Sequence, residues 1–338
     1  MNLAIEERIG DIASSYVRKK PGALLTIGVL DHGQTHIFAF GENPIQTKVQ
    51  SKDVIYEIGS ISKLFTTSLL ANLIHQRSMA LEDPIAHYWQ DIRSDCPITL
   101  KQLATHTSGL PSYRALRDIK IACSQNVQRD PYCQYSLEEL RQLINRTTAI
   151  GKGKFRYSNV GMGLLGQLMA WHHRTSYAEL LDRLIAKPLR MQDTFIALTN
   201  VNPDRVIQGH TSKGIPVGPL AMSDFQGAGA IRSTVSDQLR FLSAHMTAQE
   251  GSAFAMTHVP HVKITNKLSS GLGWMMDKEM LCHNGATTGF SSFMGMDKSA
   301  QAGVVVLSNY RNSLIQDTPD RIAYDVMAAL TGRGRQQT

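Results

Sequence analysis

Short apolar runs separated by polar turns occur at both ends of the chain, as is typical of the strands of an antiparallel sheet. Near the amino end, Leu24–Leu30 and Thr35–Phe40 flank a polar turn, and this pattern predicts a hairpin. Extended apolar segments also follow one another near the carboxyl end: Gly271–Met276, Met280–Ala286, Ser291–Met296 and Gly303–Asn309. We therefore expect one sheet that is built from both chain ends.

Helical patterns occupy the two termini and the middle of the chain. Residues 4–18 and Asp320–Leu330 each have one apolar face, and residues 60–230 are mostly helical, with capping signals at Thr99 and Ser136. The simplest architecture is α+β, with an antiparallel sheet flanked by the terminal helices and an all-helical insertion.

This architecture predicts two parts with any functional site between them. Residues 1–59 and 231–338 would form the part with the sheet, and residues 60–230 would form the mostly helical part. Two irregular stretches, residues 112–135 and 199–229, interrupt the helical part. The first is long enough to border a cleft.

Composition narrows the classes of function. The 338 residues are 42% hydrophobic and 19% charged, which is enough for a sizeable core. No apolar run reaches the length of a membrane span. The net charge of +7 is scattered, whereas nucleic-acid binding favours a basic stripe with aromatic residues, so we expect no nucleic-acid partner. The first residues lack the order of a signal peptide, which indicates the cytoplasm unless a leader was removed.

The cysteines do not form a metal motif. Cys96, Cys123, Cys133 and Cys282 include no C-x-x-C pair of the kind that binds zinc. Cys123 and Cys133 could bridge a loop in an oxidising compartment, but free thiols are the expected state.

The segment Ser60-Ile61-Ser62-Lys63 is the strongest candidate for a catalytic motif in the sequence. Residues three apart share a helix face, so the Ser60 hydroxyl and the Lys63 amine can meet at the start of a buried helix. A serine needs a neighbouring base, and a lysine serves as one when burial lowers its pKa. Free backbone amides at a helix start also suit a developing oxyanion. The same four residues would equally fit a capped helix with a solvated lysine.

Two further stretches have a structural interpretation as well as a catalytic one. Tyr157-Ser158-Asn159 precedes an apolar helix and could be a helix start with a packed tyrosine. His283-Asn284-Gly285 lies in an apolar strand, where a histidine bonded to backbone would be ordinary. We expect His106 to be structural and to fix the turn that ends at Pro111. Tyr113 is a candidate for lining the cleft.

The order and spacing of these motifs resemble the penicillin-recognising serine hydrolases, in the branch with class C β-lactamases, serine D-Ala-D-Ala carboxypeptidases, D-aminopeptidases and related esterases. Ser60–Lys63 resembles the nucleophile motif, and Tyr157–Asn159 resembles the Tyr-x-Asn motif of this branch. His283–Gly285 stands in the place of Lys-Thr-Gly, and His106–Pro111 is a further family-like stretch. The resemblance covers about residues 10 to 330 and implies the β-lactamase/transpeptidase-like fold.

The resemblance implies a role for each motif. Ser60 would attack an amide or ester carbonyl to form an acyl-enzyme, with Lys63 and Tyr157 sharing the roles of base and acid. The backbone N–H groups of Ser60 and Ala286 would form the oxyanion hole. Asn159 would bind the substrate's amide carbonyl and hold Lys63. The other substrate-binding candidates are His283, Asn284, Gly285 and Tyr113. Water would hydrolyse the acyl-enzyme, and neither a metal nor an organic cofactor is required.

His283 departs from the pattern and leaves the substrate open. β-Lactamases of this branch usually carry lysine there, a permanent charge for the substrate carboxylate, whereas histidine is neutral for much of the time near pH 7. One hypothesis is a β-lactamase or D-alanyl-D-alanine carboxypeptidase. A second is a small-ester esterase or D-aminopeptidase. The third, a binding or sensor module without turnover, predicts missing catalytic residues. The expected partner is a small molecule or peptide: a β-lactam, a D-amino-acid peptide or an ester.

Overall fold

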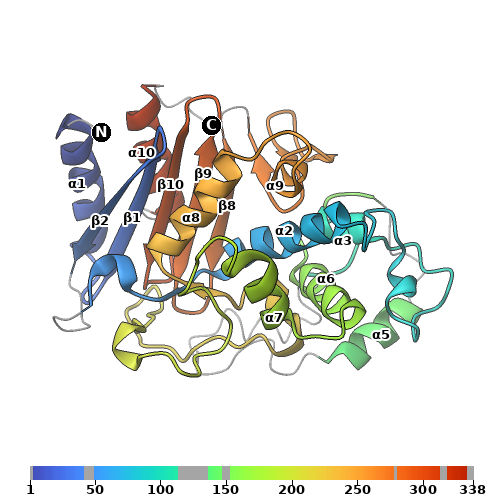
Figure 1. Cartoon of the computed structure of the whole chain (residues 1–338). Helices are drawn as coiled ribbons and strands as arrows, with labels where there is room; N and C mark the ends of the chain where they lie inside the picture. Colours follow the sequence, from blue (N-terminus) through green and yellow to red (C-terminus); the bar gives the residue numbers. More distant parts are fainter. Residues whose placement is uncertain are drawn as a thin grey trace.

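The computed structural model has an antiparallel sheet at its centre, and Figure 1 shows helices packed around it. The structure describes residues 3–41, 49–112, 136–146, 153–277, 280–312 and 318–332. Within these ranges, eight strands form the sheet in the order β2-β1-β10-β9-β8-β7-β6-β5. Their bounds are β1 Leu24–Asp31, β2 Gln34–Gly41, β5 Val262–Lys263, β6 Ser269–Ser270, β7 Met275–Met276, β8 Leu281–Ala286, β9 Ser291–Asp297 and β10 Ala302–Ser308.

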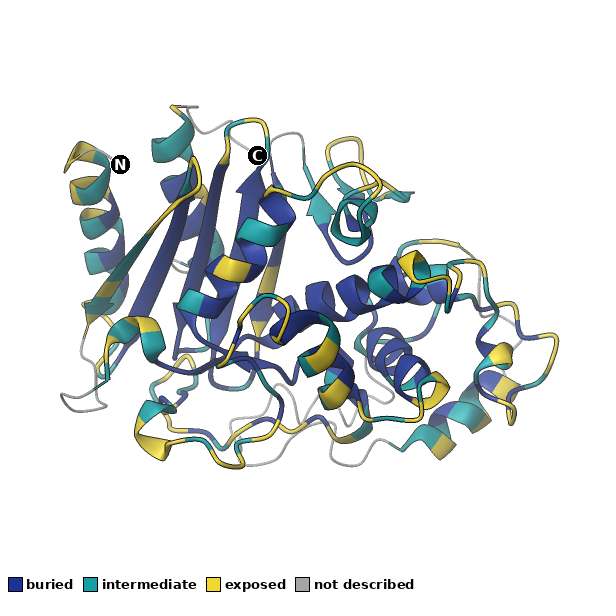
Figure 2. Ribbon diagram, viewed as in Figure 1, coloured by how far each residue is buried: buried dark blue, intermediate teal, exposed yellow. Residues whose placement is uncertain are grey.

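The central strands are buried on both faces, as the dark blue ribbons of Figure 2 show. Every residue of β9 and β10 is buried, and so is every residue of β1 except the last. Strands covered on both faces have continuous apolar runs rather than alternating ones, which is the pattern of these segments. The edge strand β2 is partly exposed along its length.

The two terminal helices cover one face of the sheet. Ile9 of α1 (Leu3–Val17) and Val326 of α10 (Pro319–Thr331) belong to one buried cluster with Val304 of β10. The amino and carboxyl ends of the chain therefore meet in the same half of the molecule (Figure 1).

Helix α8 (Val235–Met246) covers the opposite face. Its approach to β1 needs a glycine, because a Cβ at Gly28 would lie 2.7 Å from Cγ2 of Val235 and 3.0 Å from the side chain of Leu239. The sheet is thus covered by helices on both faces.

Helix α2 (Ser62–His75) is the most buried helix of the helical part, and its buried residues occupy every face. A helix with this pattern is surrounded by other elements. It contacts α6 (Asn159–His172), which is capped by the side chain of Ser158. The other described helices and helical turns are α3 Leu100–Ala104, α5 Leu137–Arg146, α7 Tyr177–Leu181, α9 Ala253–Thr257, a π-helix at Asp182–Ala186, and 3-10 turns at Ser51–Asp53, Gly59–Ile61, Ile85–His87, Pro203–Arg205 and Ser223–Ala228.

A second, two-stranded sheet lies between the main sheet and the helical part. It pairs β3 (Tyr56–Glu57) with β4 (Arg232–Ser233). The backbone N–H of Ile58 extends this pairing by donating to the carbonyl of Ile231 at 3.1 Å. The chain therefore enters the turn at Ser60 directly from a fixed strand.

The predicted α+β architecture and the hairpin are confirmed, and two local predictions need correction. The segment Gly271–Met276 is not one strand, because the left-handed backbone of Gly273 (φ +78°) turns the chain between β6 and β7. Ser60 lies in a 3-10 turn that precedes α2 rather than in the helix itself.

Several predictions fall outside the described residues. Tyr113, Cys123 and Cys133 lie there, as does most of the irregular stretch that contains them. Cys96 and Cys282 are buried free thiols. Across the described part of the chain, no helix has both the length and the apolar character needed to cross a bilayer.

Candidate active site

Ser60 and Lys63 are in direct contact. Nζ of Lys63 lies 2.8 Å from Oγ of Ser60 and 2.6 Å from the backbone carbonyl of Ala228. Ser60 lies in the 3-10 turn and Lys63 is the second residue of α2, so the helical rise brings the residue three positions later over the hydroxyl. The hydroxyl, the amine and a carbonyl from a distant segment thus form one hydrogen-bonded group.

Lys63 is fully buried, with none of its side chain exposed to solvent. Burial lowers the pKa of Lys63 well below its ordinary value, because a charged amine loses its hydration inside the protein. The Ala228 carbonyl, which accepts a hydrogen bond from Lys63, is uncharged. It therefore does not act as the negative counter-ion that a buried charged amine would need. A neutral amine has a free lone pair, and this allows Lys63 to accept the Ser60 proton.

The ring of Tyr157 lies beside Lys63. Nζ of Lys63 is 4.9 Å from the centroid of the Tyr157 ring. The rings of two histidines also lie near this tyrosine, that of His106 at a centroid distance of 4.5 Å and that of His283 at 6.2 Å. Four residues that are far apart in the sequence therefore share one site.

His106 holds the segment that carries Tyr157. Its Nδ1 accepts a hydrogen bond from the backbone N–H of Ser158 at 3.2 Å, and its carbonyl accepts one from the N–H of Arg156 at 2.7 Å. Oγ of Ser158 donates in turn to the carbonyl of Pro111 at 2.7 Å. His106 adopts a left-handed backbone (φ +58°), and burial lowers its pKa well below the usual value. It thus fixes residues 156–158 and not only the turn that follows it.

Asn159 begins α6 on the same side of the site. Its side-chain amide donates to Oγ of Ser112 at 3.4 Å. This hydrogen bond joins the start of α6 to the segment that ends at Ser112.

The turn at Ser60 is packed against the end of β8. Gly59 has a left-handed backbone (φ +52°), and a Cβ at this position would lie 2.6 Å from the backbone nitrogen of Ala286. At Gly285, a Cβ would lie 2.2 Å from the carbonyl oxygen of Ile58. Only glycine allows these two close approaches. The backbone of the Ser60 turn and that of Ala286 are consequently in contact, as a shared oxyanion hole would need.

Residues 283 and 284 point to opposite faces of β8, as alternate strand positions do. His283 is buried beside Tyr157, whereas the exposed Asn284 donates from its side chain to Asp320 of α10 at 2.9 Å. Only the backbone of Asn284 is thus left to contribute to the site.

The ring of His283 is held in one tautomer. Its Nδ1 lies 2.6 Å from the carbonyl of Asn284, so Nδ1 carries the proton and donates. Burial and the neighbouring Lys63 lower the pKa of His283 to about 4. Its Nε2 is buried and has no hydrogen-bond partner among the described residues. At neutral pH, His283 therefore presents an unprotonated acceptor and not a positive charge.

Within the described ranges, no three His, Cys, Asp or Glu side chains are placed to hold a metal ion.

The family model named Beta-lactamase matches residues 13–326. The chain belongs to the beta-lactamase family.

Proteins similar to this chain include beta-lactamases and a D-alanine carboxypeptidase. The beta-lactamase of Providencia stuartii is 26% identical over 245 residues, which cover 71% of this chain and 60% of that protein, or less than two thirds of its length. The beta-lactamase of Escherichia coli (strain K12) is 26% identical over 292 residues, 81% of this chain and 72% of that protein.

Two solved structures share the fold of this beta-lactamase family member. A class C beta-lactamase superposes with a TM-score of 0.82 at 20% identity and covers 98% of each chain. The D-alanine carboxypeptidase AmpC from Burkholderia cenocepacia superposes with a TM-score of 0.79 at 21% identity, over 96% of this chain and 99% of that one. The expected β-lactamase/transpeptidase fold is therefore confirmed.

One contributor to the site has no signature in the sequence. Ala228 binds Lys63 through its backbone carbonyl, and it lies in the irregular stretch of residues 199–229. A carbonyl is common to every residue, so composition and motif spacing give no indication of it. Its position follows from the packing of the 3-10 turn Ser223–Ala228 between α2 and α6.

Proposed function

We propose that this protein is a serine hydrolase that acts through an acyl-enzyme on amide bonds, of the β-lactamase or D-alanyl-D-alanine carboxypeptidase type. The observation that carries the proposal is the buried Lys63 amine, 2.8 Å from Oγ of Ser60, with a pKa that burial lowers. A serine beside a base that favours its neutral form is an activated nucleophile.

The first step is attack by Ser60 on the substrate carbonyl. Lys63 and Tyr157 together take up the serine proton and return one to the leaving group. The oxyanion is bound by the backbone N–H groups of Ser60 and Ala286, and the contact of Gly59 with Ala286 supports this pairing. Water then hydrolyses the acyl-enzyme and releases the acid.

The remaining residues bind and orient the substrate. Asn159 donates to the amide carbonyl of the acyl side chain, and His283 and Gly285 form the strand edge along which the substrate lies. Asn284 contributes its backbone, since its side chain is bonded to Asp320. Tyr113 is assigned to the same site as a lining residue. None of these steps requires a metal ion or an organic cofactor.

The direct test is acylation by a penicillin, followed by intact mass spectrometry. We expect a mass increase equal to one penicillin molecule in the wild type and none in Ser60→Ala. Ser176→Ala is a matched control, because it makes the same chemical change at the exposed cap of α7. Absence of an adduct in the wild type, or an adduct that remains in Ser60→Ala, would overturn the proposal. An adduct that forms but persists would show that the penicillin is trapped and not hydrolysed, and turnover of a D-alanyl-D-alanine peptide would then separate a carboxypeptidase from a binding module.

One observation favours a second candidate, a small-ester esterase or D-aminopeptidase. The pKa of His283 is lowered to about 4, so this position has no positive charge at neutral pH to pair with the carboxylate of a penicillin. Comparing kcat/KM for nitrocefin with that for p-nitrophenyl esters separates the two candidates. Faster turnover of the esters by the wild type would support the second.

A further inference from the structure

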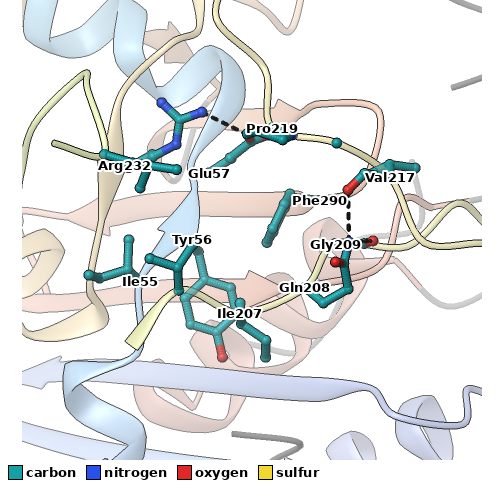
Figure 3. A pocket seen from close by; sticks show the side chains of 13 residues that line it. Ile55, Tyr56, Glu57, Ile207, Gln208, Gly209, Val217, Pro219, Arg232 and Phe290 are labelled. Atoms are coloured by element: carbon teal, nitrogen blue, oxygen red, sulfur yellow. Dashed lines mark hydrogen bonds and ion pairs between the residues drawn. The ribbon is translucent and has the colours of Figure 1, made fainter. Parts of the chain in front are cut away.

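A cavity of about 180 Å³ is lined in part by residues that shortly precede Ser60 in the chain, and it is drawn in Figure 3. None of Ser60, Lys63, Tyr157 and His283 lines it. Its walls come from β3, from the two segments 206–209 and 217–219, from β4 and from the turn before β9. Residues whose side chains form most of the wall are Tyr56, Glu57, Ile207, Val217, Arg232 and Phe290.

The apolar part of the wall is rigid. The rings of Tyr56 and Phe290 meet edge to face at a centroid distance of 6.4 Å, and the hydroxyl of Tyr56 is hydrogen-bonded to Thr26 at 2.7 Å. Behind Phe290 the backbone is so close that a Cβ at Gly209 would lie 2.4 Å from the ring. Gln208 and Pro219 line the cavity and are exposed, so it opens to solvent beside them. The cavity is therefore formed before any molecule enters it.

One polar atom in the wall is unsatisfied. Oε1 of Glu57 accepts hydrogen bonds from the N–H of Leu220 at 2.7 Å and from Nη2 of Arg232 at 3.2 Å. Oε2 of the same carboxyl group is buried and has no partner within hydrogen-bond distance in the described part of the chain, while the nearby Thr287 side chain interacts with the carboxyl group and lowers its pKa. The side chain of Glu57 is only 6% exposed. A buried oxygen without a partner is costly, and here it belongs to a residue that lines a cavity.

Charge and size restrict what can occupy the cavity. The guanidinium of Arg232 already balances Glu57 and also donates to the carbonyls of Leu220 and Ile196, so a charged ligand would bring an uncompensated charge into a buried site. The volume resembles that of a cavity of about 150 Å³ in another protein that binds benzene. Burial raises the pKa of Glu57 while Arg232 lowers it, and a hydroxyl can bond to the carboxyl group in either protonation state.

We propose that this cavity binds a small neutral phenol or alcohol, whose hydroxyl bonds to Oε2 of Glu57 and whose hydrocarbon part packs against Ile207, Val217 and Phe290. The ligand would sit against the strand that enters the Ser60 turn, so the cavity is a separate binding site next to the catalytic one. The proposal does not depend on the hydrolase activity of Ser60.

The test is a ¹⁹F NMR titration of the full-length protein with 4-fluorophenol, with fluorobenzene as the ligand that lacks a hydroxyl. We expect saturable binding of 4-fluorophenol and an affinity for fluorobenzene that is about tenfold weaker, as the loss of a hydrogen bond to a charged group predicts. Binding should also raise the melting temperature, because a ligand of the folded state stabilises it.

Two variants locate the site. Gly218 lines the cavity, and a Cβ there contacts nothing within 4 Å, so Gly218→Leu should fold and reduce the affinity by about tenfold or more. Gly10→Leu on α1 is its matched control, because the nearest atom to a Cβ there is 3.9 Å away, on the ring of Phe40.

Three outcomes would overturn the proposal. One is that 4-fluorophenol does not bind saturably to the wild type, which would leave the cavity to water. The second is equal affinity in the wild type and a folded Gly218→Leu. The third is equal affinity for fluorobenzene and 4-fluorophenol, which would remove the role of Glu57. Each readout is a binding measurement, so an inactive but folded hydrolase would not affect it.

Discussion

The backbone N–H of Ser158 donates a hydrogen bond of 3.2 Å to Nδ1 of His106, and this bond fixes the peptide that carries Tyr157. The ring of His106 also packs against that of Tyr157 at a centroid distance of 4.5 Å. His106 is therefore a positioning residue for the candidate site, in addition to being part of the core.

Replacing His106 tests this positioning role. His106→Ala should leave the Ser158 N–H buried without an acceptor, lower the melting temperature and slow acylation by about tenfold or more. His106→Asn should recover part of both losses, because asparagine tolerates the left-handed backbone at φ +58° and offers an acceptor oxygen. Stopped-flow acylation and thermal unfolding measure the two effects. A purely structural residue would change stability without changing the acylation rate of the folded fraction.

Lys63→Met tests the buried base through stability. Burial lowers the pKa of Lys63 in the folded state, so below the unfolded-state pKa of about 10.4 the unfolded chain binds more protons than the folded one. The free energy of unfolding should therefore rise with pH in this window, by about 1.4 kcal/mol per pH unit from this group alone. Lys63→Met lacks this dependence. We expect it to melt above the wild type at pH 7 and the gap to shrink toward pH 10.

Thermal unfolding of both proteins from pH 6 to pH 10 measures this gap. Lys63 also lowers the pKa of His283 and of His106, but these rings titrate at or below the ordinary histidine pKa of about 6.5, so the difference above pH 7.5 isolates Lys63. A gap that stays constant with pH would contradict a lowered pKa. Lys63→Met should also be inactive toward every substrate of the wild type, since methionine cannot accept a proton.

His283→Lys tests the substrate preference. A lysine would restore a positive charge beside the site, so kcat/KM for nitrocefin relative to a neutral ester should rise by about tenfold. Asn284→Lys is the matched control, because its side chain points to the other face of β8 and meets Asp320. If both variants changed the ratio equally, a general increase in charge would explain the effect.

Gly59→Ala tests the contact between the nucleophile turn and β8. The new methyl group would meet the backbone of Ala286 at 2.6 Å and would also occupy a left-handed conformation. Gly33→Ala, at φ +82° with nothing within 4 Å, isolates the conformational cost, which is about 1 kcal/mol. Chemical denaturation should show a clearly larger loss for Gly59→Ala, accompanied by loss of acylation. Equal losses in the two variants would show that the turn can move away from β8.

Much of this fold follows from patterns that the sequence carries locally. The continuous apolar runs of β1, β9 and β10 predict buried strands, and Thr99 caps α3 as expected. The strand predicted at Gly271–Met276 is wrong because a left-handed glycine turns the chain within an apolar run. Periodicity describes which side chains are buried, and a run of six apolar residues does not reveal a turn inside it.

The candidate site is less accessible to local reasoning, since its parts come from distant segments. The spacing of Ser60 and Lys63 predicts that they meet, as they do. The carbonyl of Ala228 and the free oxygen of Glu57 depend on how segments more than 160 residues apart pack, and no residue pattern encodes them. The opposite orientation of Asn284 follows from strand alternation, but only once the face that His283 occupies is known.

The pairing of β1 with β10 has a consequence for biosynthesis. Leu25 lies opposite Ser308, so β1 can pair with β10 only after residue 308 has left the ribosome, long after β1 itself has emerged. Strand β8, which supplies His283 and Ala286, also arrives late, whereas Ser60 and Lys63 emerge early. Contacts of such long separation slow folding. A chain that stalls before residue 281 would hold Ser60 in its 3-10 turn and Lys63 on α2 without the strand β8 that completes the site.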